Sequence, residues 1–245
     1  MFTKKNLFCM VVCFVVIISM SLSVCGAVFN DTEGHWAEET IDKWADMGVI
    51  TGYEGNFNPD TPIIRGEFAV IIDRLMKYTE TSVNTFSDLD KDAYYTEAIL
   101  KLNKMSVMLG YNGKVSPEEY LTREEAFVML NRVFEIKGED KALPFSDASE
   151  ISDWALDAVK VMHGAGIING NENNMVCPQD NITRAEVIQL LDNIGNLKNE
   201  NDASLIPGYV PNISGLVVNK PSTKPDGSKD ESGDEDIIDA GKIQW

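Results

Sequence analysis

The apolar residues of this chain recur at helical spacing in six segments, which form three pairs along the sequence. Within each segment they are three or four residues apart, and this spacing places them on one face of an amphipathic helix. The first helices carry these apolar positions: Ala37, Ile41, Trp44 and Ala45; Tyr95, Ile99 and Leu102; Ala155, Val159 and Met162. The second helices carry Phe68, Ile72, Leu75 and Met76; Phe127, Leu130 and Phe134; Val187, Ile188 and Leu191. We therefore predict three helical pairs in which every helix has one buried face.

The same short motifs accompany each pair, in the same order. A Phe-x-Asp motif precedes the first helix, at 29–31, 86–88 and 145–147, and an arginine followed two residues later by glutamate opens the second helix. The arginine motifs are Ile64-Arg65-Gly66-Glu67, Thr122-Arg123-Glu124-Glu125 and Thr183-Arg184-Ala185-Glu186. The motifs recur about every 58 residues, so the chain contains three tandem repeats.

Turns separate the two helices of each repeat. A glycine-containing turn ends the first helix, and a proline turn follows at Pro59, Pro117 or Pro178, where the fixed φ and the missing N–H prevent a helix from continuing. In the last two repeats a threonine stands three residues before the glutamate of the arginine motif, which predicts a capping box. Ile64 occupies this place in the first repeat, so we expect its second helix to lack the side-chain cap.

One helical pair of this size cannot bury its own apolar faces, so the three pairs must share a core. We expect an all-α, mainly helical fold in which three helix-turn-helix repeats form a pseudo-threefold prism, with long loops between the helices. The predicted divisions are a signal peptide at 1–27, repeats at 28–82, 83–141 and 142–197, and an acidic disordered tail at 198–245. The tail is predicted to be disordered because its apolar periodicity disappears while prolines and acidic residues accumulate.

The residues before the first repeat have the composition of an export signal. Lys4 and Lys5 precede an apolar run over 7–24, and small residues follow at Gly26 and Ala27. We expect cleavage after Ala27, which leaves no membrane segment in the mature chain. The alternative is lipidation at Cys25, because the residues just before it approximate a lipobox.

Net charge and residue content exclude several classes of function. The formal net charge of −18 argues against nucleic acid as a partner. Three of the four cysteines lie in the predicted leader, so Cys177 has no intramolecular disulfide partner and is interpreted as a buried apolar side chain. His35 and His163 have no neighbours at metal-ligand spacing, and no nucleophile set is evident. We therefore predict a protein that is not an enzyme, with no catalytic residues, no cofactor and no metal.

The arginine at the start of each second helix requires an explanation, because the helix dipole favours acidic residues there. One hypothesis is a salt bridge from Arg65, Arg123 or Arg184 to the aspartate of a Phe-x-Asp motif in a neighbouring repeat. The other is that the guanidinium and the free N–H groups of the helix start bind the carboxylate or phosphate of a ligand. The two roles can coexist.

An aromatic residue at the start of each first helix is a second candidate. Trp36, Tyr94 and Trp154 could belong to the core, which is the usual place for an aromatic on an amphipathic helix. They could instead provide the flat apolar face that a sugar ring needs, beside polar groups and a turn glycine that permits close approach.

Together these motifs resemble the S-layer homology domain. The ordered set is Phe-x-Asp, Trp-Ala, Gly-x-Ile-x-Gly-Tyr, Phe-x-Pro and Thr-Arg-Ala-Glu, with the last tetrad matched in full at 183–186. The resemblance covers 28 to about 197 and implies a prism that binds secondary cell wall polysaccharide, often through a pyruvylated sugar, in grooves between repeats. Matched by motif, the implied groove residues are Asp31, Trp36, Gly52 and Arg65; Asp88, Tyr94, Gly110 and Arg123; Asp147, Trp154, Gly170 and Arg184.

The implied function is non-covalent anchoring to the bacterial cell wall, with an anionic, pyruvylated polysaccharide as the partner. The implied location is the cell wall or S-layer of the envelope, after secretion. The third repeat matches the motifs best, so we expect the main groove to use Arg184, with Asp147 and Trp154 in the same or an adjacent groove. The alternative is a cell-surface scaffold whose repeats or acidic tail bind other envelope proteins.

Overall fold

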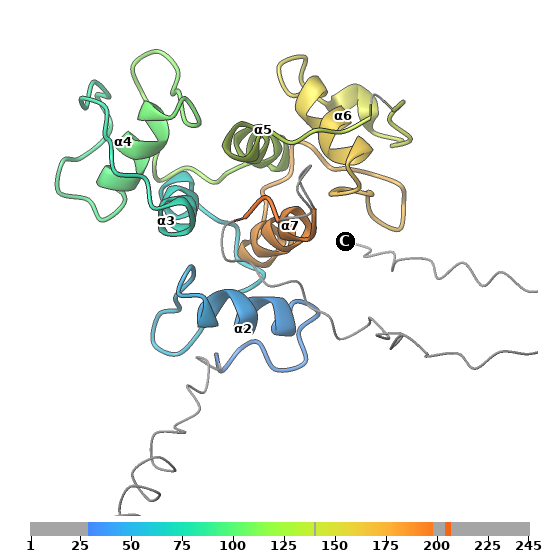
Figure 1. Ribbon diagram of the computed structural model, residues 1–245, viewed down its shortest axis with the longest axis horizontal. Helices are drawn as coiled ribbons and strands as arrows, with labels where there is room; N and C mark the ends of the chain where they lie inside the picture. Colours follow the sequence, from blue (N-terminus) through green and yellow to red (C-terminus); the bar gives the residue numbers. More distant parts are fainter. Residues whose placement is uncertain (1–28, 140, 198–203, 207–245) are drawn as a thin grey trace, which may run out of the picture. The chain divides into compact units, whose positions relative to one another are not determined.

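The computed structural model describes residues 29–139, 141–197 and 204–206, and it confirms the prediction of a mainly helical fold. The predicted signal peptide lies outside the described residues, as does the predicted tail apart from 204–206. Among the described residues there are isolated β-bridges but no strands. All six predicted helices are present (Figure 1), namely α2 (Glu38–Asp46), α3 (Arg65–Met76), α4 (Thr96–Lys104), α5 (Arg123–Phe134), α6 (Leu156–Gly164) and α7 (Arg184–Asn196), with a short 3-10 helix η1 (Ala148–Glu150).

The predicted apolar faces are buried in every helix. Ile41 and Trp44 of α2, and their counterparts in the other helices, have little or no exposed surface. Only Ala45 and Met76 among the predicted apolar positions are half-buried. The hydrophobic pattern therefore located the core correctly.

The chain forms two compact units, which divide between Pro59 and Asp60. In the first unit α2 is followed by a turn, and the rings of Phe29 and Phe57 lie 5.4 Å apart. The second unit begins just before the first arginine motif and contains α3 to α7. The proposed prism of three repeats and the repeat boundaries stay predictions.

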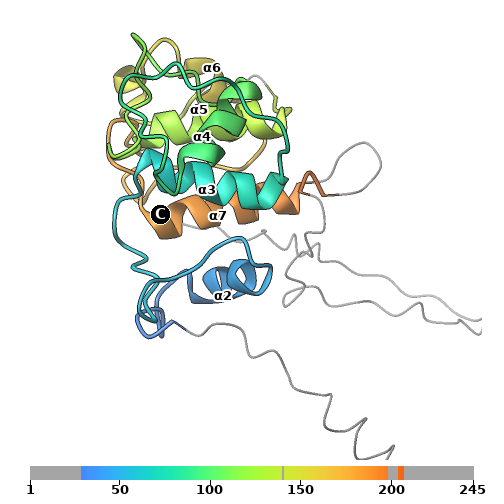
Figure 2. The same ribbon diagram turned by 90° about the vertical axis from the view of Figure 1, so that its left-hand side faces the viewer.

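Within the second unit, two of the arginine helices pack against the first helix of the following repeat. α3 contacts α4, and α5 contacts α6. Figures 1 and 2 show that α3, α5 and α7 run in about the same direction, with α4 and α6 outside them. The packing partner of α5 is thus α6, and not α4, the helix that precedes it in its own repeat.

A closed ring of backbone hydrogen bonds joins the residues that lead into α3, α5 and α7. The N–H of Ile63 donates to the carbonyl of Ile182 at 3.0 Å, that of Ile182 to Leu121 at 2.9 Å, and that of Leu121 to Ile63 at 3.0 Å. All three side chains are fully buried. The ring gives this part of the second unit cyclic pseudo-symmetry and brings the three arginine motifs to one place.

The helix starts are capped as the motifs predict. The Thr122 hydroxyl accepts from the Glu125 amide at 3.3 Å, while the Glu125 carboxylate accepts from the Thr122 amide at 3.0 Å. Thr183 and Glu186 form the same capping box. Ile64 provides no side-chain cap for α3. Both predictions are confirmed.

Gly66 makes room for an aromatic side chain of the next repeat. A Cβ at this position would lie 2.6 Å from the ring of Tyr95, which is buried. The Tyr95 hydroxyl donates to the carboxylate of Glu118, and this hydrogen bond, together with burial, raises the pKa of Tyr95 to about 12. The equivalent of Tyr95 in the third repeat is Ala155, so this contact is specific to the junction of the first two repeats.

Candidate functional site

Each arginine of the three motifs forms an ion pair with the motif glutamate of the next repeat. Nη1 of Arg65 lies 2.7 Å from Oε1 of Glu125, and Nη1 of Arg123 lies 2.7 Å from Oε1 of Glu186. The series closes with Nη1 of Arg184, which lies 3.3 Å from Oε2 of Glu67. The repeat-to-repeat salt bridge is therefore present, but its predicted partner, the Phe-x-Asp aspartate, is wrong.

The Phe-x-Asp aspartates order the turn of their own repeat instead. Asp88 accepts from the amides of Val115 at 3.0 Å and Ser116 at 2.8 Å. Burial alone would raise the pKa of Asp88, but these two amides and Lys114 lower it below its ordinary value. The same pairs of bonds run from Phe57 and Asn58 to Asp31, and from Val176 and Cys177 to Asp147.

Several backbone N–H groups at the helix starts already bind other parts of the protein, so these groups are not open to a ligand. The amide of Arg65 donates to the carbonyl of Glu119 at 3.0 Å, and that of Gly66 to Pro117 at 2.9 Å. In the same way Arg123 donates to Asp180 at 2.9 Å. The proline turn of the next repeat thus satisfies donors that a helix cannot satisfy internally.

The three aromatic residues that open the first helices lie at the surface. Trp36 is 53% exposed, Tyr94 68% and Trp154 57%. The core interpretation of these side chains is wrong, because the residues that follow Trp36 and Trp154, namely Ala37 and Ala155, are buried in their place. The exposed rings are available to a ligand.

The turn glycines allow each Phe-x-Asp phenylalanine to pack against its own turn. A Cβ on Gly110 would lie 2.6 Å from the ring of Phe86 and 2.5 Å from the carbonyl oxygen of Lys114. Gly110 also has φ of +71°, which favours glycine. Gly52 and Gly170 make the corresponding approaches to Phe29 and Phe145.

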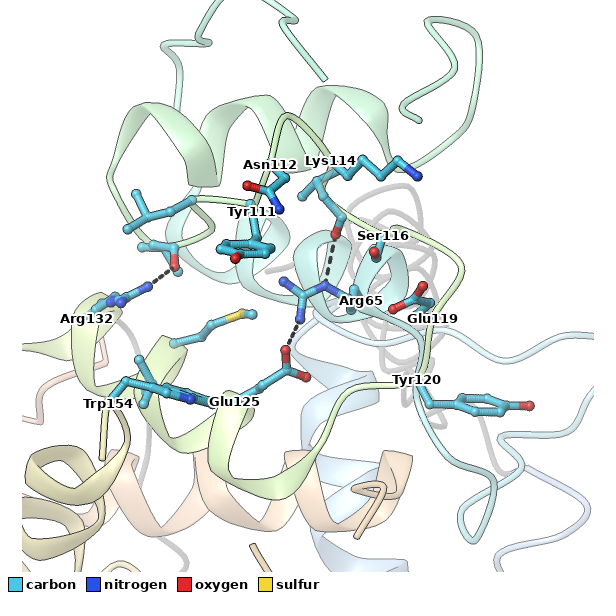
Figure 3. Close-up of a pocket in the computed structure, with 16 residues that line it drawn as sticks. Arg65, Tyr111, Asn112, Lys114, Ser116, Glu119, Tyr120, Glu125, Arg132 and Trp154 are labelled. Carbon is cyan, nitrogen blue, oxygen red and sulfur yellow. Dashed lines mark hydrogen bonds and ion pairs between the residues drawn. The ribbon is translucent and has the colours of Figure 1, made fainter. Parts of the chain in front are cut away.

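A pocket of about 620 Å³ in the second unit, called the Arg65 pocket below, brings together residues of all three repeats (Figure 3). Three predicted site residues line it, namely Arg65, Gly110 and Trp154. The full lining is Arg65, Val107, Leu109, Gly110, Tyr111, Asn112, Lys114, Val115, Ser116, Glu119, Tyr120, Glu125, Val128, Met129, Arg132 and Trp154. An arginine of one repeat, a glycine of the next and an aromatic of the one after therefore share a pocket, whose volume is within the range of roughly 300–1,000 Å³ typical of small-molecule sites.

The guanidinium of Arg65 lies at this pocket, and only part of its hydrogen-bonding capacity is used within the described residues. Its Nε donates to the carbonyl of Val115 at 2.9 Å and its Nη1 to Glu125, but no described residue bonds to its Nη2. The side chain is only 10% exposed. Fixed at two points and little hydrated, this guanidinium is well placed to bind an anionic group of a ligand.

The sequence model of the S-layer homology domain matches this chain at 28–69, 85–127 and 144–188. The chain belongs to the S-layer homology domain family. S-layer homology domains are binding domains that generally anchor proteins to the cell wall, and they are not catalytic themselves.

The relatives include surface-layer and cell-surface proteins. The chain is 34% identical to the surface-layer 125 kDa protein of Lysinibacillus sphaericus, over 60% of this chain and 12% of that protein. It is 33% identical to an amylopullulanase of Thermoanaerobacterium thermosulfurigenes, over 69% of this chain and 10% of that protein. It is 28% identical to the cellulosome-anchoring protein of Acetivibrio thermocellus, over 58% of this chain and 34% of that protein.

These relatives place the chain at the surface of the bacterial envelope. It spans about a tenth to a third of the length of the three relatives. In the part of the chain that the structure describes, no helix has the length and hydrophobicity required to cross a bilayer. Within the same residues no group of three or more His, Cys, Asp or Glu side chains could hold a metal ion.

In the second unit an aromatic residue also lies within electrostatic range of Arg184. Burial raises the pKa of Tyr94, as do Glu67 and Glu118, whereas Arg184 lowers it. Tyr94 of the second repeat therefore lies near Arg184 of the third, while Trp154 lies in the pocket of Arg65. Asp147 accepts hydrogen bonds from two amides of its own turn.

Sequence reasoning missed several residues of the Arg65 pocket. Tyr111, which is 81% exposed, follows Gly110 in the glycine turn and was visible as the last residue of the Gly-x-Ile-x-Gly-Tyr pattern. Lys114 and Arg132 had no signal of their own, because a single basic residue on a turn or an exposed helix face is common. The folded structure brings them together with Arg65 of the first repeat and Trp154 of the third.

Proposed function

We propose that this chain anchors non-covalently to the bacterial cell wall by binding an anionic wall polysaccharide in the Arg65 pocket. The observation that carries the proposal is the combination, in one pocket, of a nearly buried guanidinium with an open Nη2 and an exposed indole from Trp154. A guanidinium recognises carboxylates, and an aromatic face accommodates a sugar ring.

A pyruvylated sugar fits this chemistry. A pyruvate ketal places one carboxylate directly on the sugar, so Arg65 could bind the carboxylate while Trp154 contacts the ring. Leu109 and Met129, which also line the pocket, offer apolar surface for the methyl group of the ketal. The pocket thus provides a partner for each part of such a ligand.

Local charge supports an anionic ligand even though the whole chain is strongly acidic. Arg65, Lys114 and Arg132 line the pocket, against the two carboxylates of Glu119 and Glu125. Glu125 is already paired with Arg65. The pocket is therefore a basic site in a chain of formal charge −18, and its donors act locally where the overall field would repel the ligand.

The range of relatives supports a binding role for the whole chain, which we propose is not an enzyme. The same region occurs in an amylopullulanase, a surface-layer protein and a cellulosome-anchoring protein, whose names describe different activities. A shared region in such different proteins is better explained by a common attachment than by a common reaction.

The experiment that tests the proposal measures binding of the purified protein to isolated cell walls. Walls are compared before extraction, after extraction of the polysaccharide, and after removal of its pyruvyl groups alone. We expect binding to the intact walls and a large loss in both other cases. Binding that survives polysaccharide extraction would refute the proposal and favour a scaffold that binds other envelope proteins.

A further inference from the structure

Arg132 forms a second cationic position in the Arg65 pocket. It lies on α5 and is exposed, and Figure 3 shows it on the opposite side of the pocket from Arg65. Its Nη1 donates to the carbonyl of Val107 at 3.1 Å, which fixes the guanidinium against the glycine turn of its own repeat. No carboxylate among the described residues forms an ion pair with it, so its charge is not neutralised in the way that Glu125 neutralises Arg65.

The structural task of Arg132 does not require a positive charge. In the third repeat the equivalent position on α7 is Asn193, whose side-chain amide donates to the carbonyl of Ile167 at 3.0 Å. This is the same bond that Arg132 makes to Val107, made by a neutral side chain. The charge of Arg132 is therefore available for another role.

The positions between the two arginines suit a ligand longer than one sugar. Tyr111 and Trp154 line the pocket between them, on opposite sides in the view of Figure 3, and both rings are more than half exposed. Two aromatic faces can contact successive sugar rings, and the cationic groups at the two ends can bind groups on different sugars.

From this arrangement we infer that Arg132 binds a second anionic group of the same polymer. The ligand of this pocket is then an oligosaccharide segment with negative charges on at least two of its sugars, one held by Arg65 and the other by Arg132. The inference rests on the proposed function and specifies the class of ligand. It also makes the grooves unequal, because Asn193 cannot provide the second charge in the third repeat.

The test uses oligosaccharides released from isolated walls and separated by anion exchange into fractions with one and with two negative charges. The variant is Arg132→Asn, which copies Asn193 and should keep the bond to Val107. Arg132→Lys preserves the charge. Lys91→Asn removes one positive charge outside the pocket, from a residue whose ion pair with Asp92 is exposed.

The wild-type protein should bind the fraction with two charges more tightly than the fraction with one. Arg132→Asn should weaken binding of the fraction with two charges about threefold to fivefold, as expected for an exposed ion pair. Its affinity for the fraction with one charge should not change. Arg132→Lys should retain most of the affinity, and Lys91→Asn all of it. Equal wild-type affinity for the two fractions, or an equal loss for both in Arg132→Asn, would overturn the inference. Failure of the wild type to bind walls at all would instead refute the proposed function.

Discussion

Glu125 binds two partners from two repeats at once. Its Oε1 lies 2.7 Å from Nη1 of Arg65, and its Oε2 accepts from the amide of Thr122 at 3.0 Å. The carboxylate that caps α5 is thus the carboxylate that holds the first repeat's arginine in place. Helix initiation and the contact between repeats therefore depend on the same side chain.

The substitution Glu125→Gln should destabilise the fold. It removes the charge that pairs with Arg65, whose side chain is only 10% exposed, and leaves a guanidinium with little water around it. We expect a loss of about 2 kcal/mol in the free energy of unfolding, measured by urea denaturation. Glu97→Gln is the control, because Glu97 is 75% exposed in its pair with Lys101 and should cost less than about 1 kcal/mol. Equal losses for the two variants would contradict the role given to Glu125.

Gly66→Ala should destabilise the protein although it lies in a helix. Replacing an exposed helical glycine by alanine normally stabilises by about 1 kcal/mol. Here the added Cβ would lie 2.6 Å from the ring of Tyr95 and 3.2 Å from the carbonyl oxygen of Pro117. Tyr95 must shift, so we expect a lower melting temperature than wild type. The double variant Gly66→Ala with Tyr95→Ala should remove most of the clash, and a higher melting temperature for Gly66→Ala alone would contradict the packing.

Gly110→Ala should be more damaging than Gly113→Ala. Both glycines have φ near +70°, so alanine is strained at either position by roughly 1 kcal/mol. A Cβ at Gly113 meets nothing within 4 Å, whereas one at Gly110 meets the ring of Phe86 at 2.6 Å. Thermal unfolding of both variants checks this prediction. If they lose the same stability, the contact with Phe86 has no energetic weight.

Asp88 should contribute to stability at neutral pH and lose this contribution in acid. Its pKa in the folded state is lowered from the ordinary value of 3.8, because the amides of Val115 and Ser116 outweigh the effect of burial. An acidic group with a lowered pKa stabilises the folded state at pH values above the pKa that it has in the unfolded chain. This stabilisation is lost as the pH falls through the pKa that it has in the folded state. The stability of Asp88→Asn should therefore be below wild type at pH 7, and the difference should shrink below about pH 4. Denaturation at several pH values would reveal a constant difference if Asp88 had no such role.

Local features of this fold could be predicted from sequence. The six helices, their buried faces and the two capping boxes depend on residues a few positions apart, and each is visible as spacing. The uncapped start of α3 follows from Ile64 in the same way.

The partner of the arginines could not be predicted by the same means. The repeats place an aspartate and a glutamate at regular offsets from every arginine, so periodicity alone does not distinguish Asp88 from Glu125. The structure distinguishes the two, because the carboxylate of Asp88 accepts hydrogen bonds from the amides of its own turn. Sequence left open whether Trp154 lies in the core or at the surface for a related reason, since it lies before the start of α6 at Leu156, where helical spacing does not apply.

The affinity of Trp154→Ala for the extracted wall polysaccharide tests the central claim most directly. Trp154 is 57% exposed, so removal of its side chain should leave the fold intact. Val83→Ala is the control, because Val83 is 82% exposed and lies outside the pocket. We expect Trp154→Ala to weaken binding about tenfold or more, with an unchanged melting temperature, and Val83→Ala to bind like wild type. Wild-type affinity for a folded Trp154→Ala would contradict binding of the polysaccharide in the Arg65 pocket.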